Sequence, residues 1–285
     1  MIQLFPSTDD KRADSSTADP NTSPGSGAVD QHDEATGVML RVARESREPG
    51  PHRPWVYTNM IVAADGATTV DGLSGELGGD GDRMMFRALR AQADIILVGA
   101  GTARAEGYRP PQRYEVAQEF RLDRGQRARP RLALVTRSLD LDAGLAIFED
   151  DAPETRPLII SSQRSWTERG GDLSERAEPI VAGDEDVDLG DALGQLKQRG
   201  FDRVLCEGGP SLNGRLVAAD LIDEWNLTIA PLLAGGESTR AAVGPMPGGP
   251  PPGMRLDRVW LREEYLFCRW IRRDRSRPGE STTSD

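Results

Sequence analysis

The feature that most constrains the fold is an alternation of strand-like and helical runs between about residues 54 and 274. Short apolar runs typical of buried strands are separated by runs with apolar residues at helical spacing. This alternation predicts an α/β domain built on a largely parallel sheet, because parallel strands are joined by helical crossovers. We expect strands at Trp55–Ala63, Asp94–Ala100, Arg131–Thr136, Pro157–Ser162, Arg203–Glu207 and within Glu224–Gly236, and helices at Asp82–Ala93, Asp191–Gly200 and Ser211–Leu221.

The two ends of the chain differ in composition from this body. Residues 1–53 are rich in Ser, Thr, Asp, Pro and Gly, which predicts a mostly disordered extension. Only the piece Gly37–Ser46 has helical periodicity. Residues 254–273 predict an antiparallel hairpin at one edge of the sheet, and residues 275–285 a disordered tail. The expected organisation is therefore an extension (1–53), a folded domain (54–274) and a tail (275–285).

Charge and residue usage exclude several classes of protein. The net charge is −11, with 35 basic and 46 acidic residues, so no general basic field can hold nucleic acid. The two cysteines lie in apolar runs, and the two histidines lie in the polar N-terminal region, so we expect no metal site. No apolar run approaches the ~20 residues that span a bilayer. We expect a soluble cytoplasmic protein with a small-molecule partner.

The loop after the strand Asp94–Ala100 reads GAGTARAEGY. Gly99 and Gly101 allow a ligand to approach the backbone closely, because no side chain stands in the way. Thr102 adds a hydroxyl, and Glu106 adds a carboxylate. Since ligands of open α/β sheets bind outside the carboxyl ends of strands, this loop is a candidate site, with a plain tight turn as the alternative.

A second loop, EGGPSL, follows the strand that ends at Glu207. Gly208 and Gly209 predict a turn, and Pro210 and Ser211 predict the start of a helix, because proline suits the first helical turn. Free backbone N–H groups at such a start form an anion site that suits a diphosphate. Glu207 would repel a phosphate, so it either faces a ring rich in hydrogen-bond donors or caps the turn.

Two further segments are candidates. Ala64–Asp82 is a long glycine-rich loop, and loops of this length inside a compact domain are usually functional or mobile. Its best candidates for ligand contact are Asp65, Ser74 and Gly75; an ordinary surface loop is the alternative. After the strand Arg131–Thr136, an arginine flanked by hydroxyls would suit a ribose 2′-phosphate and so select NADPH, although a solvated turn is equally compatible. These residues are Thr136, Arg137 and Ser138.

Taken in order, these motifs resemble the reductase domain of the bacterial riboflavin-biosynthesis deaminase–reductase family. The order is DGAT, SG, a helix, ADIILVGAGTARAEGY, EGGPSL and LTIAPLLAGG, over about residues 55–272. The resemblance implies a dihydrofolate-reductase-like fold: three α/β/α layers, a mostly parallel central sheet and a C-terminal antiparallel hairpin. The zinc motifs of the deaminase half have no counterpart, which implies a stand-alone reductase.

The resemblance also implies a reaction and a cofactor. NADPH would deliver hydride to C1′ of the ring-opened ribose of 5-amino-6-(5-phosphoribosylamino)uracil, which yields the ribitylamino product. Glu106 replaces a family aspartate beside the nicotinamide and would be the catalytic carboxylate. The expected cofactor-binding residues are Gly99, Gly101, Thr102, Thr136, Arg137, Ser138, Gly208, Gly209, Pro210, Ser211, Leu212 and Asn213.

Substrate contacts and assembly follow from the same resemblance. Arg90 and Glu207 would bind the substrate together with Ser74, and Glu207 would accept hydrogen bonds from the pyrimidine N–H groups. Either Arg109 or Arg113 would hold the substrate phosphate. Family members commonly form homodimers, and the apolar C-terminal hairpin suits that role, although the same residues could fill the core of a monomer.

Two other functions stay open at this point. The sequence Glu106–Gly107–Tyr108 departs from the family's ADDP segment, so the same fold could reduce a dihydrofolate-like pterin. A protein that binds NADPH without catalysis is the third possibility.

Overall fold

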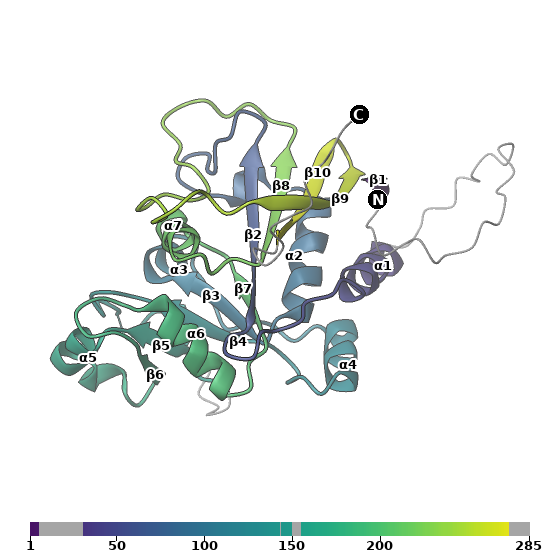
Figure 1. Cartoon of the computed structure of the whole chain (residues 1–285). Helices are drawn as coiled ribbons and strands as arrows, with labels where there is room; N and C mark the ends of the chain where they lie inside the picture. The colour runs from purple at the N-terminus through teal and green to yellow at the C-terminus, as the bar shows by residue number, and fades with distance from the viewer. Residues whose placement is uncertain (6–30, 143, 150–154, 274–285) are drawn as a thin grey trace, which may run out of the picture.

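The computed structural model describes residues 1–5, 31–142, 144–149 and 155–273, which form one ten-stranded sheet with helices on both faces (Figure 1). The strands are β1 (Ile2–Phe5), β2 (Trp55–Ala63), β3 (Ile95–Gly99), β4 (Arg131–Val135), β5 (Leu158–Ser161), β6 (Glu178–Val181), β7 (Arg203–Cys206), β8 (Glu224–Ala230), β9 (Met254–Arg262) and β10 (Tyr265–Arg272). The α-helices are α1 (Gln31–Ala43), α2 (Asp80–Gln92), α3 (Ala100–Ala105), α4 (Glu115–Asp123), α5 (Gln163–Arg169), α6 (Leu189–Gln198) and α7 (Pro210–Ala218).

The order of strands in the sheet is β1-β9-β10-β8-β2-β7-β3-β4-β5-β6. From β8 to β6 every neighbouring pair is parallel, whereas β10, β9 and β1 add antiparallel strands at one edge. This arrangement confirms the predicted, mostly parallel sheet with a C-terminal antiparallel hairpin. Each predicted strand is present within a residue or two of its expected bounds, apart from the last, where the strand ends at Ala230 before the glycine turn.

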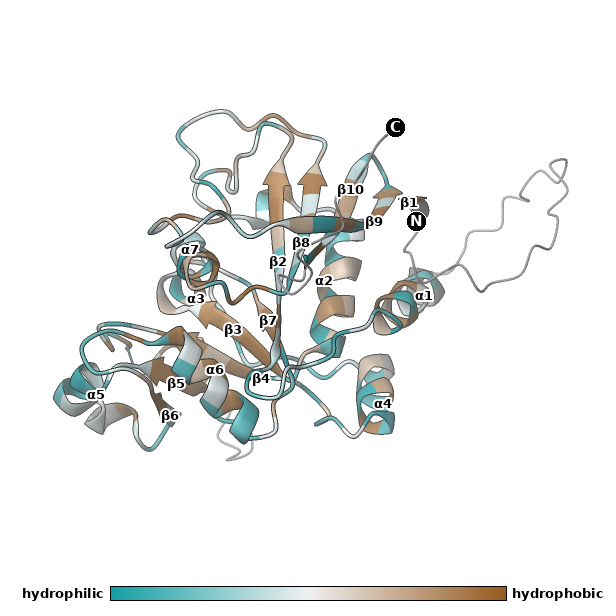
Figure 2. Cartoon of the chain, viewed as in Figure 1, coloured by the Kyte–Doolittle hydropathy of each residue, from teal (hydrophilic) through white to brown (hydrophobic). Residues whose placement is uncertain are grey.

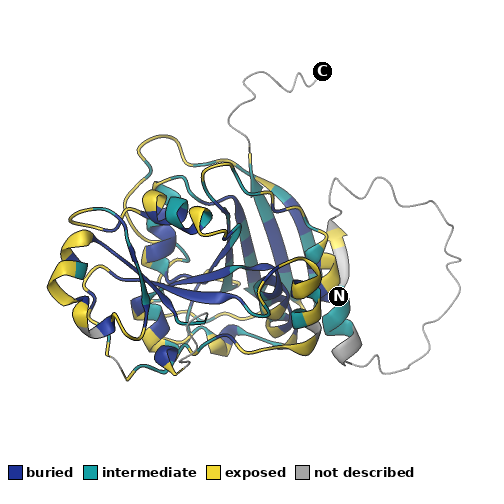
Figure 3. Ribbon diagram, turned by 90° about the horizontal axis from the view of Figure 1, so that it is seen from below, coloured by how far each residue is buried: buried dark blue, intermediate teal, exposed yellow. Residues whose placement is uncertain are grey.

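The central strands are apolar on both faces because helices cover both sides. Val56 and Val204 pack in the cluster that contains α6 and α7, whereas their neighbours Tyr57 and Leu205 pack against α1 and α2. Figure 2 shows these strands mostly in the brown of apolar residues, and Figure 3 shows them buried beneath helices with exposed outer faces. The predicted three-layer α/β/α arrangement is confirmed.

Strand β7 determines where a ligand can bind. It pairs in parallel with β2 through Arg203–Cys206 and with β3 through Val204–Cys206, although both partners precede it by about a hundred residues or more. The carboxyl ends of β7, β3 and β4 therefore lie side by side at one edge of the sheet. Ligand sites of open α/β sheets form at such an edge, where the order of strands along the sheet reverses.

Part of the N-terminal region packs on this domain. Val38 and Val42 of α1 are fully buried beside α2, and α1 overlaps the predicted helical piece Gly37–Ser46. Residues 6–30 and the predicted tail 275–285 lie outside the described residues. The predicted boundaries at 53 and 274 stay predictions. None of the helices in the described ranges is long and apolar enough to cross a bilayer.

A buried ion cluster joins the segment after α1 to the sheet. The fully buried carboxylate of Glu224 accepts from Arg47 at 2.6 Å, Arg269 at 3.0 Å and the Trp55 indole at 3.2 Å. Burial alone would raise the pKa of Glu224, but the charges of Arg47 and Arg269 outweigh it and lower the pKa to about 2. Breaking such a pair leaves uncompensated buried charges, which costs far more than losing a surface ion pair.

We therefore expect Glu224→Gln to lower the free energy of unfolding at pH 7 by about 3–5 kcal/mol, because the buried guanidinium groups of Arg47 and Arg269 each lose one carboxylate partner. Urea denaturation measures this. The depressed pKa means that the ionised carboxylate contributes stability above pH 4.5 and that this contribution falls as the pH drops toward about 2.

The matched control is Glu185→Gln. Its carboxylate pairs with Arg164 at 2.9 Å on the surface, with side chains 77% and 60% exposed, and such pairs contribute about 0–1 kcal/mol. Equal effects of the two substitutions would contradict the importance of the buried cluster.

Candidate active site

Two cavities reach the carboxyl edge of the parallel strands, one at Glu207 after β7 and the other at Gly99 in β3. The arginine-lined cavity has a volume of about 510 Å³ and lies between α2, the segment after α3, and α4. The glycine-lined cavity has a volume of about 640 Å³ and lies above β3, β4 and the start of α7. Thr102 and Glu207 line the first cavity, whereas Gly99 and Gly101 line the second, so the loops that follow β3 and β7 contribute to the site.

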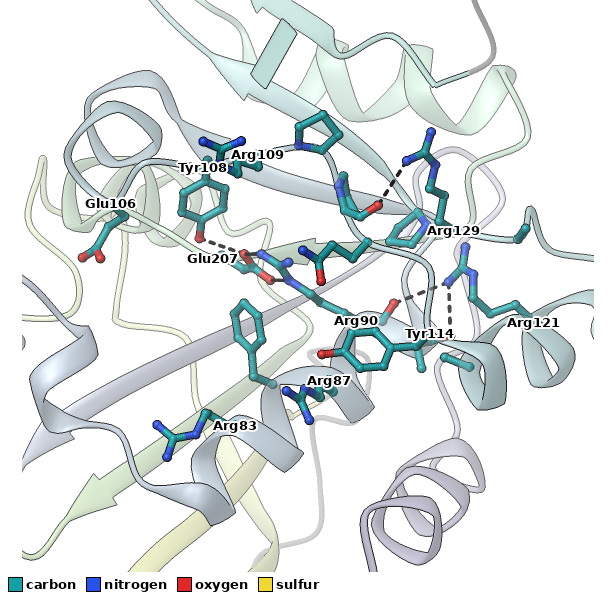
Figure 4. Close-up of a pocket in the computed structure, with 18 of the residues that line it drawn as sticks. Arg83, Arg87, Arg90, Glu106, Tyr108, Arg109, Tyr114, Arg121, Arg129 and Glu207 are labelled. Atoms are coloured by element: carbon teal, nitrogen blue, oxygen red, sulfur yellow. Dashed lines mark hydrogen bonds and ion pairs between the residues drawn. The ribbon is translucent and has the colours of Figure 1, made fainter. Parts of the chain in front are cut away.

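Glu207 lines the arginine-lined cavity, and Figure 4 shows its carboxylate in the middle of the side chains that surround it. Its carboxylate accepts two hydrogen bonds from Arg90, from Nε at 2.7 Å and from Nη2 at 2.7 Å. The Tyr108 hydroxyl donates a third, at 2.8 Å. The Glu207 side chain is only 2% exposed. The carboxylate therefore fixes two cavity residues from different elements, rather than capping its own turn.

Burial and charge set the protonation of these partners. Burial raises the pKa of the Tyr108 phenol well above its ordinary value, and the Glu207 charge acts in the same direction. Burial alone would lower the pKa of Arg90, but the charge of Glu207 and its hydrogen bonds outweigh that effect and raise it. Tyr108 therefore stays a neutral donor, and Arg90 stays a cation.

Glu106 follows α3 at another wall of the cavity. Its carboxylate accepts from the backbone N–H of Ser74 at 3.1 Å and from the Ser74 hydroxyl at 3.0 Å. These bonds join the long loop after β2 to the end of α3. Ser74 therefore lies beside the predicted catalytic carboxylate, and Figure 4 shows that carboxylate apart from the Glu207 cluster.

The start of α7 packs directly on α3. Gly209 is the N-cap residue, Pro210 is the first helical residue, and α7 has nine residues. A Cβ at Gly209 would lie 2.2 Å from Thr102 Oγ1, and a Cβ at Gly99 would lie 3.5 Å from the Gly209 nitrogen. Only glycine at 209 permits this approach. The free N–H groups of the helix start therefore lie close to the glycine-bearing loop after β3.

The predicted 2′-phosphate segment lies at the glycine-lined cavity. Thr136, Arg137 and Ser138 all line it, and Arg137 and Ser138 are exposed. The Thr136 hydroxyl accepts from the Leu139 backbone N–H at 3.1 Å, so it shapes the turn. The described part of the chain shows no partner for the Arg137 guanidinium, which leaves a cation at this wall.

Most predicted site residues fall at one of the two cavities. The arginine-lined cavity contains Ser74, Arg90, Thr102, Glu106, Arg109 and Glu207, and the glycine-lined cavity contains Gly99, Gly101, Thr136, Arg137, Ser138, Ser211 and Leu212. Gly208, Gly209 and Pro210 form the turn between them. Arg113 and Asn213 line neither.

Asn213 has a structural task instead. It is fully buried, its side chain accepts from the Cys206 thiol at 3.3 Å, and it donates to the Ala241 carbonyl at 2.8 Å. It thereby fastens the loop after β8 to α7. Asp65 has a similar task, since its carboxylate accepts from the backbone N–H groups of Ala67 at 3.3 Å and Gly235 at 2.7 Å.

Sequence reasoning missed several residues that line the cavities. In the sequence Tyr108 stands out only as a departure from a motif, yet its hydroxyl donates to Glu207. Arg83 and Arg87 also line the arginine-lined cavity, and their spacing with Arg90 on one helix face was a readable signal. Arg104 and the segment 243–245 line the other cavity, and no local pattern marks them as such.

Comparison with known proteins assigns the family. The family model of the RibD C-terminal domain matches residues 54–261, so the chain belongs to this family. It is 31% identical over 191 residues to 2,5-diamino-6-ribosylamino-4(3H)-pyrimidinone 5′-phosphate reductase of Methanothermobacter thermautotrophicus, covering 67% of this chain and 84% of that protein. The riboflavin biosynthesis protein RibD of Mycobacterium tuberculosis is 29% identical over 236 residues, 78% of this chain and 58% of that one.

Among solved structures, a pyrimidine reductase-like protein from Corynebacterium diphtheriae has a similar fold. It is 29% identical, with a TM-score of 0.70, and the match covers 78% of this chain and 93% of that chain. The family expected from the sequence motifs and the expected fold class are both confirmed.

The contact between α7 and α3 yields a testable prediction. Gly209→Ala should destabilise the domain by about 1–3 kcal/mol, the usual cost of overpacking, because the new methyl group collides with the Thr102 hydroxyl. In the double variant Thr102→Ala/Gly209→Ala, the nearest contact becomes the residue 102 Cβ at 3.5 Å, so most of that stability should return. Thermal unfolding of both variants measures this.

Gly171→Ala is the control, because a Cβ there has nothing within 4 Å. It should unfold like the parent protein. If the double variant is no more stable than Gly209→Ala, the collision with Thr102 is not the cause of the lost stability.

Proposed function

We propose that this protein is an NADPH-dependent reductase of riboflavin biosynthesis that reduces the ribosyl group of 5-amino-6-(5-phosphoribosylamino)uracil to the ribitylamino product. The observation that carries the proposal is the pair of adjoining cavities, one with glycines and a helix start and one with Glu106, Glu207 and arginines. Their meeting point at Thr102 and Gly209 would place cofactor and substrate side by side. The names of the sequence relatives support the same chemistry.

The residues of the glycine-lined cavity suit a dinucleotide. The backbone N–H groups at the start of α7 would hold its diphosphate, since a helix N-terminus favours anions. Arg137 and Ser138 would hold a ribose 2′-phosphate, which supports NADPH over NADH. NADPH, when bound, supplies hydride for C1′ of the substrate. Gly101 lines this cavity, and a Cβ there would have nothing within 4 Å, so a ligand could approach the backbone closely.

Glu106 is the residue that we assign to proton transfer. Addition of hydride to C1′ of the ring-opened imine requires a proton for the attached nitrogen. Glu106 lies at the cavity wall, and Ser74 orients its carboxylate through two hydrogen bonds. A carboxyl group held in one orientation within reach of the substrate, directly or through one water, can deliver that proton.

Glu207 has less capacity to accept hydrogen bonds from the pyrimidine than the sequence predicts. A carboxylate offers about four acceptor positions, and Arg90 and Tyr108 occupy three of them. One position on Oε1 remains for a pyrimidine N–H. Glu207 would therefore act mainly by fixing Arg90 and Tyr108, whose remaining N–H groups and hydroxyl oxygen would contact the pyrimidine.

Two related pyrimidines fit the proposal. The uracil substrate carries oxygen at C2, whereas the substrate in the names of the archaeal relatives is a 2,5-diaminopyrimidinone with an amino group there. The two differ only at one exocyclic position. Neither the site nor the named relatives favour the alternative, a dihydrofolate-like pterin.

The assembly and location stay predictions. Trp260 and Phe267 of the C-terminal hairpin are buried in the core of the monomer, whereas Val259, Leu266 and Trp270 are partly exposed and could contact a second copy. Light scattering that gives a monomer mass would reject the predicted homodimer. A cytoplasmic location accords with two buried free cysteines.

The test of the proposed function is NADPH oxidation with three compounds in parallel, namely each of the two phosphoribosylaminopyrimidines and dihydrofolate, beside a blank with NADPH alone. Turnover of one or both ribosylaminopyrimidines, and not of dihydrofolate, is the expected result. Turnover of dihydrofolate alone would replace the proposal with a pterin reductase. No turnover together with intact NADPH binding would favour a protein that binds the cofactor without catalysis.

A further prediction concerns Glu106. Glu106→Gln should lower kcat by about 10²- to 10⁴-fold, the usual range for general acid–base catalysis, because the amide cannot deliver a proton. NADPH affinity, measured by fluorescence titration, should stay unchanged. Glu168→Gln, on the exposed face of α5, is the control. Full activity of Glu106→Gln would remove Glu106 from the mechanism.

A further inference from the structure

The arginine-lined cavity is strongly basic, although the protein is acidic overall. Its lining contains six arginines and only two carboxylates, those of Glu106 and Glu207. The whole chain has a net charge of −11. A cavity lined by one sign of charge concentrates the opposite charge inside it. This cavity therefore suits a ligand with at least one strongly anionic group.

One face of α2 supplies half of these arginines. Arg83, Arg87 and Arg90 recur at intervals of four and three residues, so they stand in a row along the helix. Figure 4 shows Arg83 and Arg87 on the α2 wall of the cavity, on the same side as Arg90. An anionic group in the cavity can reach this row.

Most cavity arginines already have partners. Arg90 pairs with Glu207 at 2.7 Å, Arg83 with Asp80 at 2.6 Å, and Arg109 with Glu149 at 2.6 Å. Arg121 and Arg129 donate to backbone carbonyls, Arg121 to those of Ala91 and Ala93 at the end of α2, and Arg129 to Pro111 at 3.3 Å. Within the described residues, Arg87 has neither a carboxylate nor a carbonyl partner.

Arg87 is instead held by an aromatic ring. Its guanidinium carbon lies 4.9 Å from the centroid of the Tyr114 ring. Such a cation–π contact leaves the guanidinium N–H groups that point away from the ring available. These N–H groups form a fork that matches two oxygens of a phosphate. The side chain is thus oriented and charged, with its donors unused.

We propose that Arg87 binds the 5′-phosphate of the ribosylaminopyrimidine substrate, with the Tyr114 ring holding the guanidinium in place. This rests on the proposed function and identifies the phosphate end of the same cavity. Arg87 takes the phosphate-binding role for which the sequence offered Arg109 or Arg113. Arg109 is paired with Glu149, and Arg113 does not line the cavity.

The test compares a phosphorylated substrate with its dephosphorylated riboside. In Arg87→Met, kcat/KM for the phosphorylated compound should fall by about 10- to 100-fold, mainly through KM, because hydrogen bonds to a charged group are lost. For the riboside, kcat/KM of Arg87→Met should equal that of the parent enzyme. Arg87→Lys keeps the charge but loses the two-pronged donor, so its kcat/KM for the phosphorylated compound should lie between those of the parent and Arg87→Met.

The matched control is Arg124→Met. Arg124 also lies over an aromatic ring, Phe120 at 5.1 Å, but it lines neither cavity. It should leave the preference for phosphate unchanged. If Arg87→Met keeps the full preference for the phosphorylated compound, the proposal is wrong.

A binding experiment separates this inference from the proposed function. Ribose 5-phosphate, titrated into the full-length protein by calorimetry, should bind the parent at least about 10-fold more tightly than Arg87→Met, in line with the loss of a charge-assisted contact. Equal affinities, or no binding to the parent, would overturn the inference. If Arg87→Met loses ribose 5-phosphate binding but the parent protein reduces no pyrimidine, the phosphate site is supported and the proposed reaction is rejected.

Discussion

Insertion of β7 between β2 and β3 is the constraint on which the site depends. Hydrogen bonds on both sides of this strand hold Glu207 and the following glycines next to the loop after β3. The ladder continues past the strand, since Glu207 N–H donates to the Leu97 carbonyl at 2.9 Å and Gly99 N–H donates to Gly208 at 2.7 Å. One strand end thereby reaches both cavities, with Glu207 in one and the start of α7 at the other.

The charge distribution follows from this arrangement. The bidentate bond between Arg90 and Glu207 joins α2 to the end of β7, and Tyr108 connects the segment after α3 to the same carboxylate. Three elements thus meet at one buried carboxylate. The other arginines of α2 remain on the cavity wall, where they can attract an anion into an otherwise acidic protein.

Local sequence patterns were sufficient to predict the parallel sheet and the loops that line the two cavities. The runs around Ile95–Val98 and Val204–Cys206 are short and apolar, which is what strands buried on both faces require. The glycine motifs also lie where ligands of such sheets bind. The short strand β1 was not predicted, because the polar composition around it gives no sign of its pairing with the distant strand β9.

The side-chain contacts of the site were harder to predict. Nothing local to Tyr108 indicates that its hydroxyl reaches a carboxylate 99 residues away. The buried position of Asn213 likewise depends on the loop that carries Ala241. Arg87 is different: its helical spacing is visible in the sequence, but only the structure shows that no carboxylate or carbonyl among the described residues pairs with it and that it lies over the Tyr114 ring. Motifs therefore predicted which loops gather, and three-dimensional packing decides which side chains are available.

The central claim is that the two cavities bring a nicotinamide and the ribosyl C1′ together. The most direct measurement is a single turnover with NADPH deuterated at C4 of the nicotinamide, in separate experiments for each face, followed by mass and NMR analysis of the pyrimidine product. Our account predicts one deuterium at C1′ of the ribityl chain with one of the two labelled cofactors. Oxidation of NADPH with no label in the product, or with label at another carbon, would contradict it.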